Sequence, residues 1–570
     1  MQNFKKIVSN KVLDVIKTNF SSIEIEPEDI ATMLEYPPDS TMGDLALPCF
    51  KLSKTLRRSP VQIAQIIADG ISDDSVKKAE AVNGYLNISI SDSYLANVLT
   101  SGILAKGEKY GSADFGKGKT VVLDYSSPNV AKPFHIGHLG TTVIGHSLKK
   151  LHEFVGYDCV GINYLGDWGT QFGKMIVAFK KWGDKDAINE GGIDKLVELY
   201  VKFHHAAEED AALNDEARAE FHKLELGDDE NIALWKWFIE ISIAEYKKTY
   251  GQLGIEFDSY KGESFYTDKM PAQVQKLRDM GLLKIDDGAS IVDLEEYNMP
   301  PCLILKRDGS TLYPTRDIAA AVYRKQTYDF DKAIYVTSAG QSLHFAQWFK
   351  VVELMQYDWY DKLVHVPYGT VSINGAKLAT RTGNVILLKD LFAQAIDKVS
   401  EIMDEKNPNL ENKDQVAEAV GVGAIVFYYL SSNRIRDINF VLEDALSFDG
   451  NTGPYVQYTY ARTCSLIEKS KNRDINSDIV FTAQEEKDLV KTLARFPEKV
   501  LEALESYEPS VVTRYILDVA TAFNRFYHNC QILSVEDANV LSTRIALTKA
   551  TNYVLGNAFE LICLKKTEKI

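Results

Sequence analysis

Between residues 120 and about 390, short runs of aliphatic and β-branched residues alternate with helical patterns. Apolar strands that alternate with helices are typical of a parallel sheet, because helices then cover both of its faces. We therefore predict an α/β fold with a Rossmann-like parallel sheet in this part of the chain. The predicted strands are residues 121–123, 159–162, 302–305, 333–336 and 369–373.

The two ends of the chain carry different patterns. Residues 1–112 predict an N-terminal α+β domain, with helical signals at 60–71 and an alternating strand at 85–90. A Gly- and Lys-rich connector at 106–120 follows, and the parallel-sheet domain is predicted to occupy residues 113–440. Helical signals dominate after residue 416, so residues 441–570 predict a C-terminal all-α bundle.

The net charge of −16 at first argues against a nucleic-acid partner, because phosphate binding needs local positive potential. Residues 184–230 contain fifteen Asp or Glu and five Lys or Arg, a difference of −10. The remainder of the chain is therefore close to balanced, and an RNA partner stays open. The acidic stretch also interrupts the alternation of strands and helices, so we predict a helical insertion at about residues 184–260.

The six cysteines are scattered and form no C-x-x-C pair, which predicts reduced thiols, no structural zinc and no bound metal cluster. The first residues carry no apolar signal-peptide region. The longest apolar run has about half of the ~20 residues that a membrane-spanning helix needs. We therefore expect a cytoplasmic protein without a membrane partner.

The most informative segment is residues 120–141. A buried strand ends near Asp124, and a turn with two prolines leads into a helix near His138. Ligands of open α/β sheets bind at the carboxyl ends of strands, where a helix N-terminus attracts anions. The segment has neither a dinucleotide fingerprint nor a P-loop. It offers two imidazoles, His135 and His138, whose N–H groups can stabilise charge that develops on a phosphate.

An arbitrary His-x-x-His is more often a cap, a core pair or a metal site than a phosphate site. Here the tetrapeptide His135-Ile136-Gly137-His138 follows a strand, opens a helix and resembles the HIGH signature of class I aminoacyl-tRNA synthetases. The wider segment resembles the arginyl-tRNA synthetases, and four other segments match that family in order and spacing. They are residues 165–173, 312–317, 341–347 and 449–462.

The resemblance implies that the chain activates L-arginine with ATP, in the presence of Mg²⁺, and transfers the arginyl group to the terminal adenosine of tRNA(Arg). It implies ATP contacts at His135, Gly137, His138, Gly140 and Lys377, with both histidines and Lys377 also catalytic. The second class I signature, KMSKS, is altered here, because Thr380 stands in place of its second lysine. Our hypothesis is that Lys132 supplies the missing catalytic charge.

An arginine substrate carries a planar guanidinium that stays protonated, so its pocket should present carboxylates in bidentate geometry. The resemblance assigns Asp124 and Asp317 to this role and Tyr313 to the guanidinium face. Ser127, Asn129 and Gln341 match family positions that orient the α-amino and α-carboxylate groups. Taken singly, an Asp at a strand end is usually a helix cap and a Tyr is usually part of a core.

The C-terminal domain resembles an anticodon-binding bundle, which reads unpaired bases by stacking and hydrogen bonding. Tyr455, Tyr458 and Arg462 share one face of a predicted helix there. The N-terminal domain resembles one that contacts the D-loop side of the tRNA elbow, with Asn83, Tyr85 and Asn87 as candidate contacts. The resemblance also implies a monomer and an activation step that depends on bound tRNA.

Two alternatives stay open. The first is another nucleotidyltransferase with the same histidine signature, but such chains are short and lack a helical RNA-binding appendage. The second is a non-catalytic RNA-binding paralogue. The altered loop at residues 377–381 favours it, whereas the intact His135, His138 and Asp317 argue against it.

Overall fold

The computed structural model describes residues 1–20, 24–377, 386–471, 473 and 478–570. Thr380, at which the sequence departs from the second class I signature, lies outside the described residues. Within the described ranges, no helix combines the length and the apolar character needed to cross a membrane.

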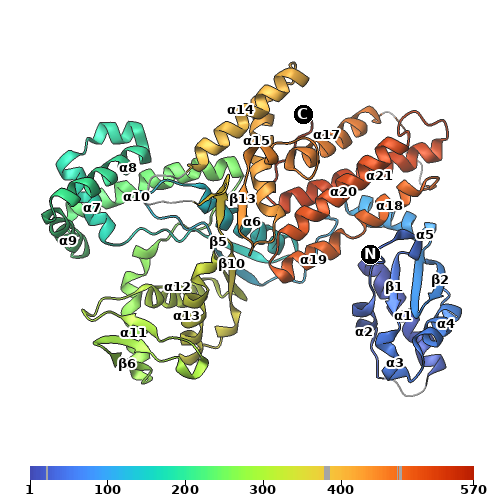
Figure 1. Ribbon diagram of the computed structural model, residues 1–570, viewed down its shortest axis with the longest axis horizontal. Helices are drawn as coiled ribbons and strands as arrows, with labels where there is room; N and C mark the ends of the chain where they lie inside the picture. The colour runs from blue at the N-terminus through green and yellow to red at the C-terminus, as the bar shows by residue number, and fades with distance from the viewer. Residues whose placement is uncertain (21–23, 378–385, 472, 474–477) are drawn as a thin grey trace.

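A four-stranded sheet occupies the centre of the molecule (Figure 1). All neighbours in it are parallel, which confirms the predicted parallel sheet. In spatial order its strands are β10 (Leu363–Tyr368), β9 (Lys332–Ser338), β4 (Thr120–Asp124) and β5 (Asp158–Ile162). The chain moves from β4 to β5 on one side and later to β9 on the other, so the strand order reverses at β4. Such a switch point opens a ligand crevice at the carboxyl ends of the strands.

Helices cover both faces of this sheet. Successive side chains of each strand point to opposite sides, so each strand contributes apolar residues to both faces. Leu123 and Ile334 pack on the face of α6 (Leu139–Phe154), in a core shared with the C-terminal helices. Val122 and Ala333 belong to a second core, on the face of α12 (Tyr313–Tyr328) and α13 (Ser342–Leu354).

Two predicted strands form but pair elsewhere, so their assignment to the parallel sheet is wrong. β8 (Cys302–Leu305) joins an antiparallel sheet with β6 (Leu283–Asp286) and β7 (Ala289–Val292). β6 and β7 are connected by Asp287 and Gly288, both with positive φ, which is typical of a tight hairpin turn. β11 (Val371–Ile373) lies between β12 (Ala376–Lys377) and β13 (Ile438–Phe440). The fourth strand of the central sheet, β10, was not predicted.

The predicted insertion is helical. It contains α8 (Lys185–Glu209), α9 (Ala212–Glu225) and α10 (Asp229–Leu253). Together with α7 (Thr170–Trp182), which precedes it, these helices connect β5 to α11 (Met270–Asp279). Val177, Phe203 and Leu213 are among the residues of a small core between α7, α8 and α9. In Figure 1 the insertion and the N-terminal domain lie at opposite ends of the molecule.

The N-terminal region has the predicted α+β character. Its antiparallel sheet has the order β1 (Leu45–Pro48), β3 (Tyr85–Ile90) and β2 (Val76–Val82). Its helices are α1 (Gln2–Asn19), α2 (Pro27–Met33), α3 (Phe50–Leu56), α4 (Pro60–Gly70) and α5 (Asp92–Asn97). Asp44 forms an ion pair of 2.6 Å with Lys491, so this region is fastened to the C-terminal helices.

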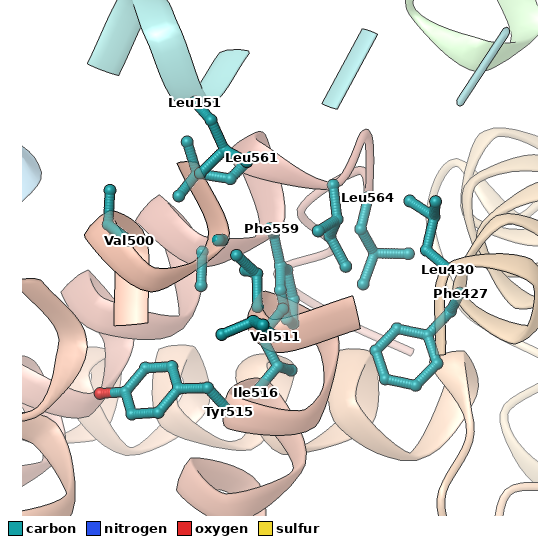
Figure 2. Packing of buried hydrophobic residues seen from close by; sticks show 14 of the residues in the cluster. Leu151, Phe427, Leu430, Val500, Val511, Tyr515, Ile516, Phe559, Leu561 and Leu564 are labelled. Carbon is teal, nitrogen blue, oxygen red and sulfur yellow. The ribbon is translucent and has the colours of Figure 1, made fainter. Parts of the chain in front are cut away.

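The C-terminal third is almost entirely helical, as predicted. Its helices are α14 (Leu388–Lys406), α15 (Lys413–Ser431), α16 (Leu442–Ala445), α17 (Gly453–Lys469), α18 (Gln484–Leu493), α19 (Phe496–Ser506), α20 (Ser510–Asn529) and α21 (Ala538–Leu561). Figure 2 shows Leu151 of α6 beside Leu561 of α21, and the Ser147 hydroxyl donates to the Leu561 carbonyl at 2.6 Å. The sheet domain and the bundle therefore share one continuous core.

Short helical turns complete the described chain. They are η1 (Ser40–Met42), the π-helical η2 (Val98–Leu104), η3 (Gly107–Lys109), η4 (Ile136–His138), η5 (Glu263–Lys269), η6 (Glu295–Tyr297), η7 (Ala339–Gln341) and η8 (Tyr360–Lys362). The predicted connector is docked rather than free, since the Asn557 side chain donates to the Tyr110 carbonyl at 3.0 Å.

Candidate active site

A cavity of about 580 Å³ opens at the carboxyl ends of β4 and β9, at the switch point of the central sheet. His138 lines it, and so do all six residues predicted to bind arginine. These six are Asp124, Ser127, Asn129, Tyr313, Asp317 and Gln341. They come from three separate segments of the chain, which the fold brings to one edge of the sheet.

The turn after β4 has a strained backbone. Ser126, Ser127 and Ala131 have φ values of 70°, 47° and 58°, a left-handed region that L-residues other than Gly, Asn and Asp rarely adopt. The hydroxyls of Ser126 and Tyr250 lie 2.7 Å apart, and the Ala131 N–H donates to the Ser242 hydroxyl at 3.0 Å. Hydrogen bonds from α10 therefore hold this turn in its unusual conformation.

A third side chain of α10 supports the same turn. The Tyr246 hydroxyl donates to the carbonyls of Asn129 at 2.7 Å and Lys132 at 2.9 Å. The predicted insertion thus contributes directly to the scaffold of the cavity. Sequence reasoning missed Ser242, Tyr246 and Tyr250, because they lie more than 100 residues from the turn that they hold.

The two signature histidines lie against each other, with ring centres 3.9 Å apart. Nδ1 of His138 accepts the N–H of His135, and Nδ1 of His135 accepts the N–H of Gly137, each at 3.1 Å. A neutral ring whose Nδ1 is an acceptor carries its proton on Nε2. Burial lowers the pKa of His138 to about 3 and also lowers that of His135, and the nearby Lys132 ammonium adds to both shifts. Both rings are therefore neutral Nε2–H donors at pH 7.

Gly140 has a packing role in the structure. A Cβ at this position would lie 2.2 Å from the Tyr429 hydroxyl, so a larger residue would collide with this side chain of α15. The sequence analysis, which gave Gly140 only as an ATP contact, did not foresee this helix contact.

The two ends of the second signature loop are described. Lys377 is the last residue of β12, at one end of the loop. At the other end, Leu388 N–H donates to the Phe134 carbonyl at 2.9 Å, and Ile136 N–H donates to the Ile386 carbonyl at 3.3 Å. Backbone hydrogen bonds therefore join the far end of this loop to the histidine segment.

Three carboxylates line the cavity, and each has a partner. Asp317 accepts from Nε2 of His344 at 2.6 Å. Glu263 lies 2.6 Å from the guanidinium of Arg316, and burial raises the pKa of Glu263 to about 7 although Arg316 opposes that rise.

The third carboxylate, Asp124, is bound on both oxygens. Oδ2 lies 2.8 Å from the Arg324 guanidinium, and Oδ1 accepts from the Ser127 hydroxyl at 2.9 Å. Burial raises the pKa of Asp124, and the charge of Arg324 opposes that rise.

Glu263, Arg324 and His344 were not predicted from the sequence. A signal for Arg324 was present, however. Tyr313, Asp317, Ala320 and Arg324 follow one another at intervals of four, three and four residues, the spacing of one helix face. All four residues line the cavity from α12.

The predicted RNA contacts of the bundle lie on α17 and form a partly exposed cluster with side chains of α20. The Arg462 guanidinium lies 5.0 Å from the ring centre of Tyr458 and 4.5 Å from that of Tyr527, and these tyrosines are 45% and 37% exposed. Asn524 accepts from Arg462 at 2.5 Å and donates to the Tyr455 hydroxyl at 2.9 Å. The sequence did not predict Asn524 or Tyr527.

The predicted elbow contacts lie on the β2–β3 hairpin. Asn83 occupies its turn with a φ of 49°, and Asn87 alternates with buried residues of β3. The exposed ring of Tyr85 meets the exposed ring of Phe50 edge-on, with ring centres 5.0 Å apart. This pair is a second aromatic surface far from the cavity.

Three family descriptions match successive parts of the chain. Residues 2–90 match "Arginyl tRNA synthetase N terminal domain", residues 99–442 match "tRNA synthetases class I (R), catalytic domain", and residues 456–570 match "DALR anticodon binding domain". Together they span nearly the whole chain, and the catalytic match alone covers more than half of it.

Individual proteins agree over the full length. The chain is 49% identical to the arginine–tRNA ligase of Alkaliphilus metalliredigens (strain QYMF), with 100% of both chains covered. The crystal structure of arginyl-tRNA synthetase from Plasmodium falciparum has a TM-score of 0.81 at 25% identity, covering 100% of this chain and 99% of that one. The Thermus thermophilus arginyl-tRNA synthetase shares the fold, with a TM-score of 0.83 at 22% identity and coverage of 99% and 100%. The chain belongs to the arginyl-tRNA synthetases, a family of class I aminoacyl-tRNA synthetases.

Proposed function

We propose that the cavity at the end of β4 activates arginine with ATP, and that the chain then transfers the arginyl group to the terminal adenosine of tRNA(Arg). The convergence of His138 with six predicted arginine-binding residues in one cavity is the observation that carries this assignment. In the first step, an α-carboxylate oxygen of arginine attacks the α-phosphorus of ATP and pyrophosphate leaves. In the second, a ribose hydroxyl attacks the arginyl carbonyl and AMP leaves.

The substrate guanidinium binds Asp317, and the exposed ring of Tyr313 packs over its face. Gln341, Ser127 and Asn129 orient the α-amino and α-carboxylate groups at the other end. Lysine is disfavoured in this arrangement, because an ammonium is a point charge that does not fit planar, bidentate contacts.

His135 and His138 stabilise the phosphate charge that grows in the transition state. Their neutral rings present Nε2–H donors, and fixed donors in a site with little water are effective without a formal charge. Gly137 and Gly140 belong to the same ATP-binding segment. The sequence pattern gives Lys377 the pyrophosphate side of the site. Lys132 supplies the charge that Thr380 cannot.

Mg²⁺ accompanies ATP in this proposal. No three His, Cys, Asp or Glu side chains among the described residues form a group that could hold a metal ion.

Two surfaces contact the tRNA. Tyr455, Tyr458 and Arg462 bind the anticodon loop, which the exposed Tyr458–Arg462–Tyr527 stack supports. Asn83, Tyr85 and Asn87 bind the elbow, which the exposed Phe50–Tyr85 pair supports. The chain acts as a cytoplasmic monomer.

ATP–pyrophosphate exchange with each of the twenty amino acids, with and without total tRNA, tests the proposal. We expect exchange with arginine only, and only when tRNA is present. Exchange with another amino acid would overturn the assignment of the pocket. Tight tRNA binding without any exchange would favour the non-catalytic alternative.

The role of Lys132 needs its own variant. Lys132→Ala is expected to lower the rate of adenylate formation, whereas Lys117→Ala, which removes an exposed lysine elsewhere, should not. Equal effects of the two changes would remove Lys132 from the catalytic set.

A further inference from the structure

Arg324 is a resident guanidinium inside a cavity assigned to a guanidinium substrate. Its side chain is 1% exposed and the carboxylate of Asp124 is 8% exposed, with 2.8 Å between the paired atoms. Both residues line the cavity. A charge pair this deeply buried loses most of its hydration, and removing one partner leaves an uncompensated charge.

Aromatic rings surround the Arg324 guanidinium. Its Cζ lies 5.1 Å from the ring centre of Tyr164, 5.9 Å from that of Tyr266 and 5.6 Å from that of Tyr335. Cation–π contacts of this kind hold a cation in one place. Arg324 is thus fixed on Asp124 by packing as well as by charge.

The charges around the cavity differ in how firmly they are paired. Asp124 and Glu263 each face an arginine, which is charged at every accessible pH. Asp317 instead faces the imidazole of His344, with 2.6 Å between Nε2 and the carboxylate oxygen.

We propose that Arg324 is a specificity-determining residue that acts through Asp124: it holds that carboxylate and thereby leaves Asp317 as the acceptor open to the substrate guanidinium. This inference rests on the proposed arginine site and revises the role predicted for Asp124. Without Arg324, two carboxylates of the same cavity compete for the substrate guanidinium. Arginine then binds in a second, unproductive position as well.

The proposal predicts opposite outcomes for single and double charge removal. Arg324→Met frees Asp124, and Asp124→Asn leaves Arg324 as an unpaired cation that repels the substrate. Each single change should raise the KM for arginine at least about tenfold, or ~1.4 kcal/mol, with little change in the KM for ATP. The double variant Asp124→Asn/Arg324→Met has no free charge at this position. It should return the arginine KM to within about threefold of the parent value.

The experiment is tRNA-dependent ATP–pyrophosphate exchange on the full-length variants, with thermal unfolding as a check on folding. Arg324→Lys keeps the charge and should keep the arginine KM near the parent value. Arg544→Met is the matched control, because Arg544 lies 2.7 Å from the buried Glu486 in the C-terminal bundle, outside the cavity. It should lower the unfolding temperature without changing the arginine KM.

Two results would overturn the proposal. If the double variant has an arginine KM as high as that of Asp124→Asn, Asp124 binds the substrate directly. If Arg324→Met lowers stability but leaves the arginine KM unchanged, Arg324 is only structural. If a single variant does not fold, the double variant and Arg324→Lys test the proposal, because each is expected to have an arginine KM near the parent value. An unchanged arginine KM in Asp317→Asn would instead refute the underlying arginine site, whatever the Arg324 series gives.

Discussion

The hydroxyl of Ser126, in the strained turn after β4, lies 2.7 Å from the hydroxyl of Tyr250 in the insertion. Asn163, which follows β5, donates to the same tyrosine hydroxyl at 2.9 Å. One side chain of α10 thus joins the segments that follow two neighbouring strands. The acidic insertion is therefore part of the scaffold of the cavity at the end of β4, in addition to being a charged helical surface.

Removing this hydroxyl should loosen the turn. Tyr250→Phe removes the acceptor of the buried Asn163 amide and leaves the Ser126 hydroxyl with Thr142 as its remaining side-chain partner, which costs about 1–3 kcal/mol of unfolding free energy. We expect kcat/KM for arginine to fall about tenfold, because Ser127 and Asn129 lie in the same turn. Chemical denaturation and pyrophosphate exchange measure the two effects. Tyr297→Phe, at an exposed site, is the control and should change neither quantity. If Tyr250→Phe has the parent's unfolding free energy and kcat/KM, α10 does not support the turn.

Ala320 lies between Asp317 and Arg324 on the cavity face of α12. A leucine at this position would fill space that the arginine side chain needs. Ala320→Leu should therefore raise the arginine KM at least about tenfold while the ATP KM stays near the parent value. Steady-state exchange kinetics at varied arginine and varied ATP separate the two. A parallel rise in both constants would mean that the change disturbs the fold rather than the guanidinium pocket.

Two buried histidines should make the protein less stable in acid. Burial lowers the pKa of His146 to about 3 and that of His152 to about 4, whereas an unfolded histidine titrates near 6.5. The unfolded state therefore binds more protons below pH 6.5, and stability falls as the pH drops toward these folded-state values. Each histidine contributes up to about 1.4 kcal/mol per pH unit.

Denaturant unfolding at pH 7, 6 and 5 measures this slope. The variant His152→Gln should reduce this slope by up to about 1.4 kcal/mol per pH unit, the contribution of one proton, because glutamine does not titrate. A slope that is the same in the variant and the parent would show that His152 takes up a proton without unfolding.

Arg462 should matter for tRNA and not for arginine. It lies between two exposed tyrosine rings, and stacking of one base on such a surface contributes about 1–3 kcal/mol. Arg462→Ala is expected to raise the KM for tRNA about tenfold in the aminoacylation assay. Arg278→Ala, which removes an exposed arginine on α11, is the control. A variant with normal tRNA KM would assign the cluster to packing.

Local patterns in the sequence were sufficient for most of the architecture. The apolar runs that became β4, β5 and β9 predicted a parallel sheet, because a strand buried on both faces must be apolar throughout. The strand, turn and helix around His135 and His138 predicted the position of the cavity, again from a local pattern. Strand ends and helix starts are decided by neighbouring residues, and an open α/β sheet binds its ligands there.

Partner choice could not be predicted from local patterns. The runs at β8 and β11 are as apolar as those of the central sheet, yet β8 pairs with the adjacent β6–β7 hairpin and β11 with β12 and β13. An apolar run indicates that a strand is buried, but it carries no information about which strand lies beside it.

The sequence by itself therefore determined the fold class, the position of the cavity and most of the residues proposed to contact arginine. Only the tertiary structure decided how those residues are held: Arg324 on Asp124, Tyr250 on Ser126 and Tyr429 against Gly140. The partners in these contacts lie more than 100 residues apart. A local pattern indicates which side chains of a segment are buried and which secondary structure its backbone adopts. Contacts between distant segments depend instead on how whole layers of the fold pack together.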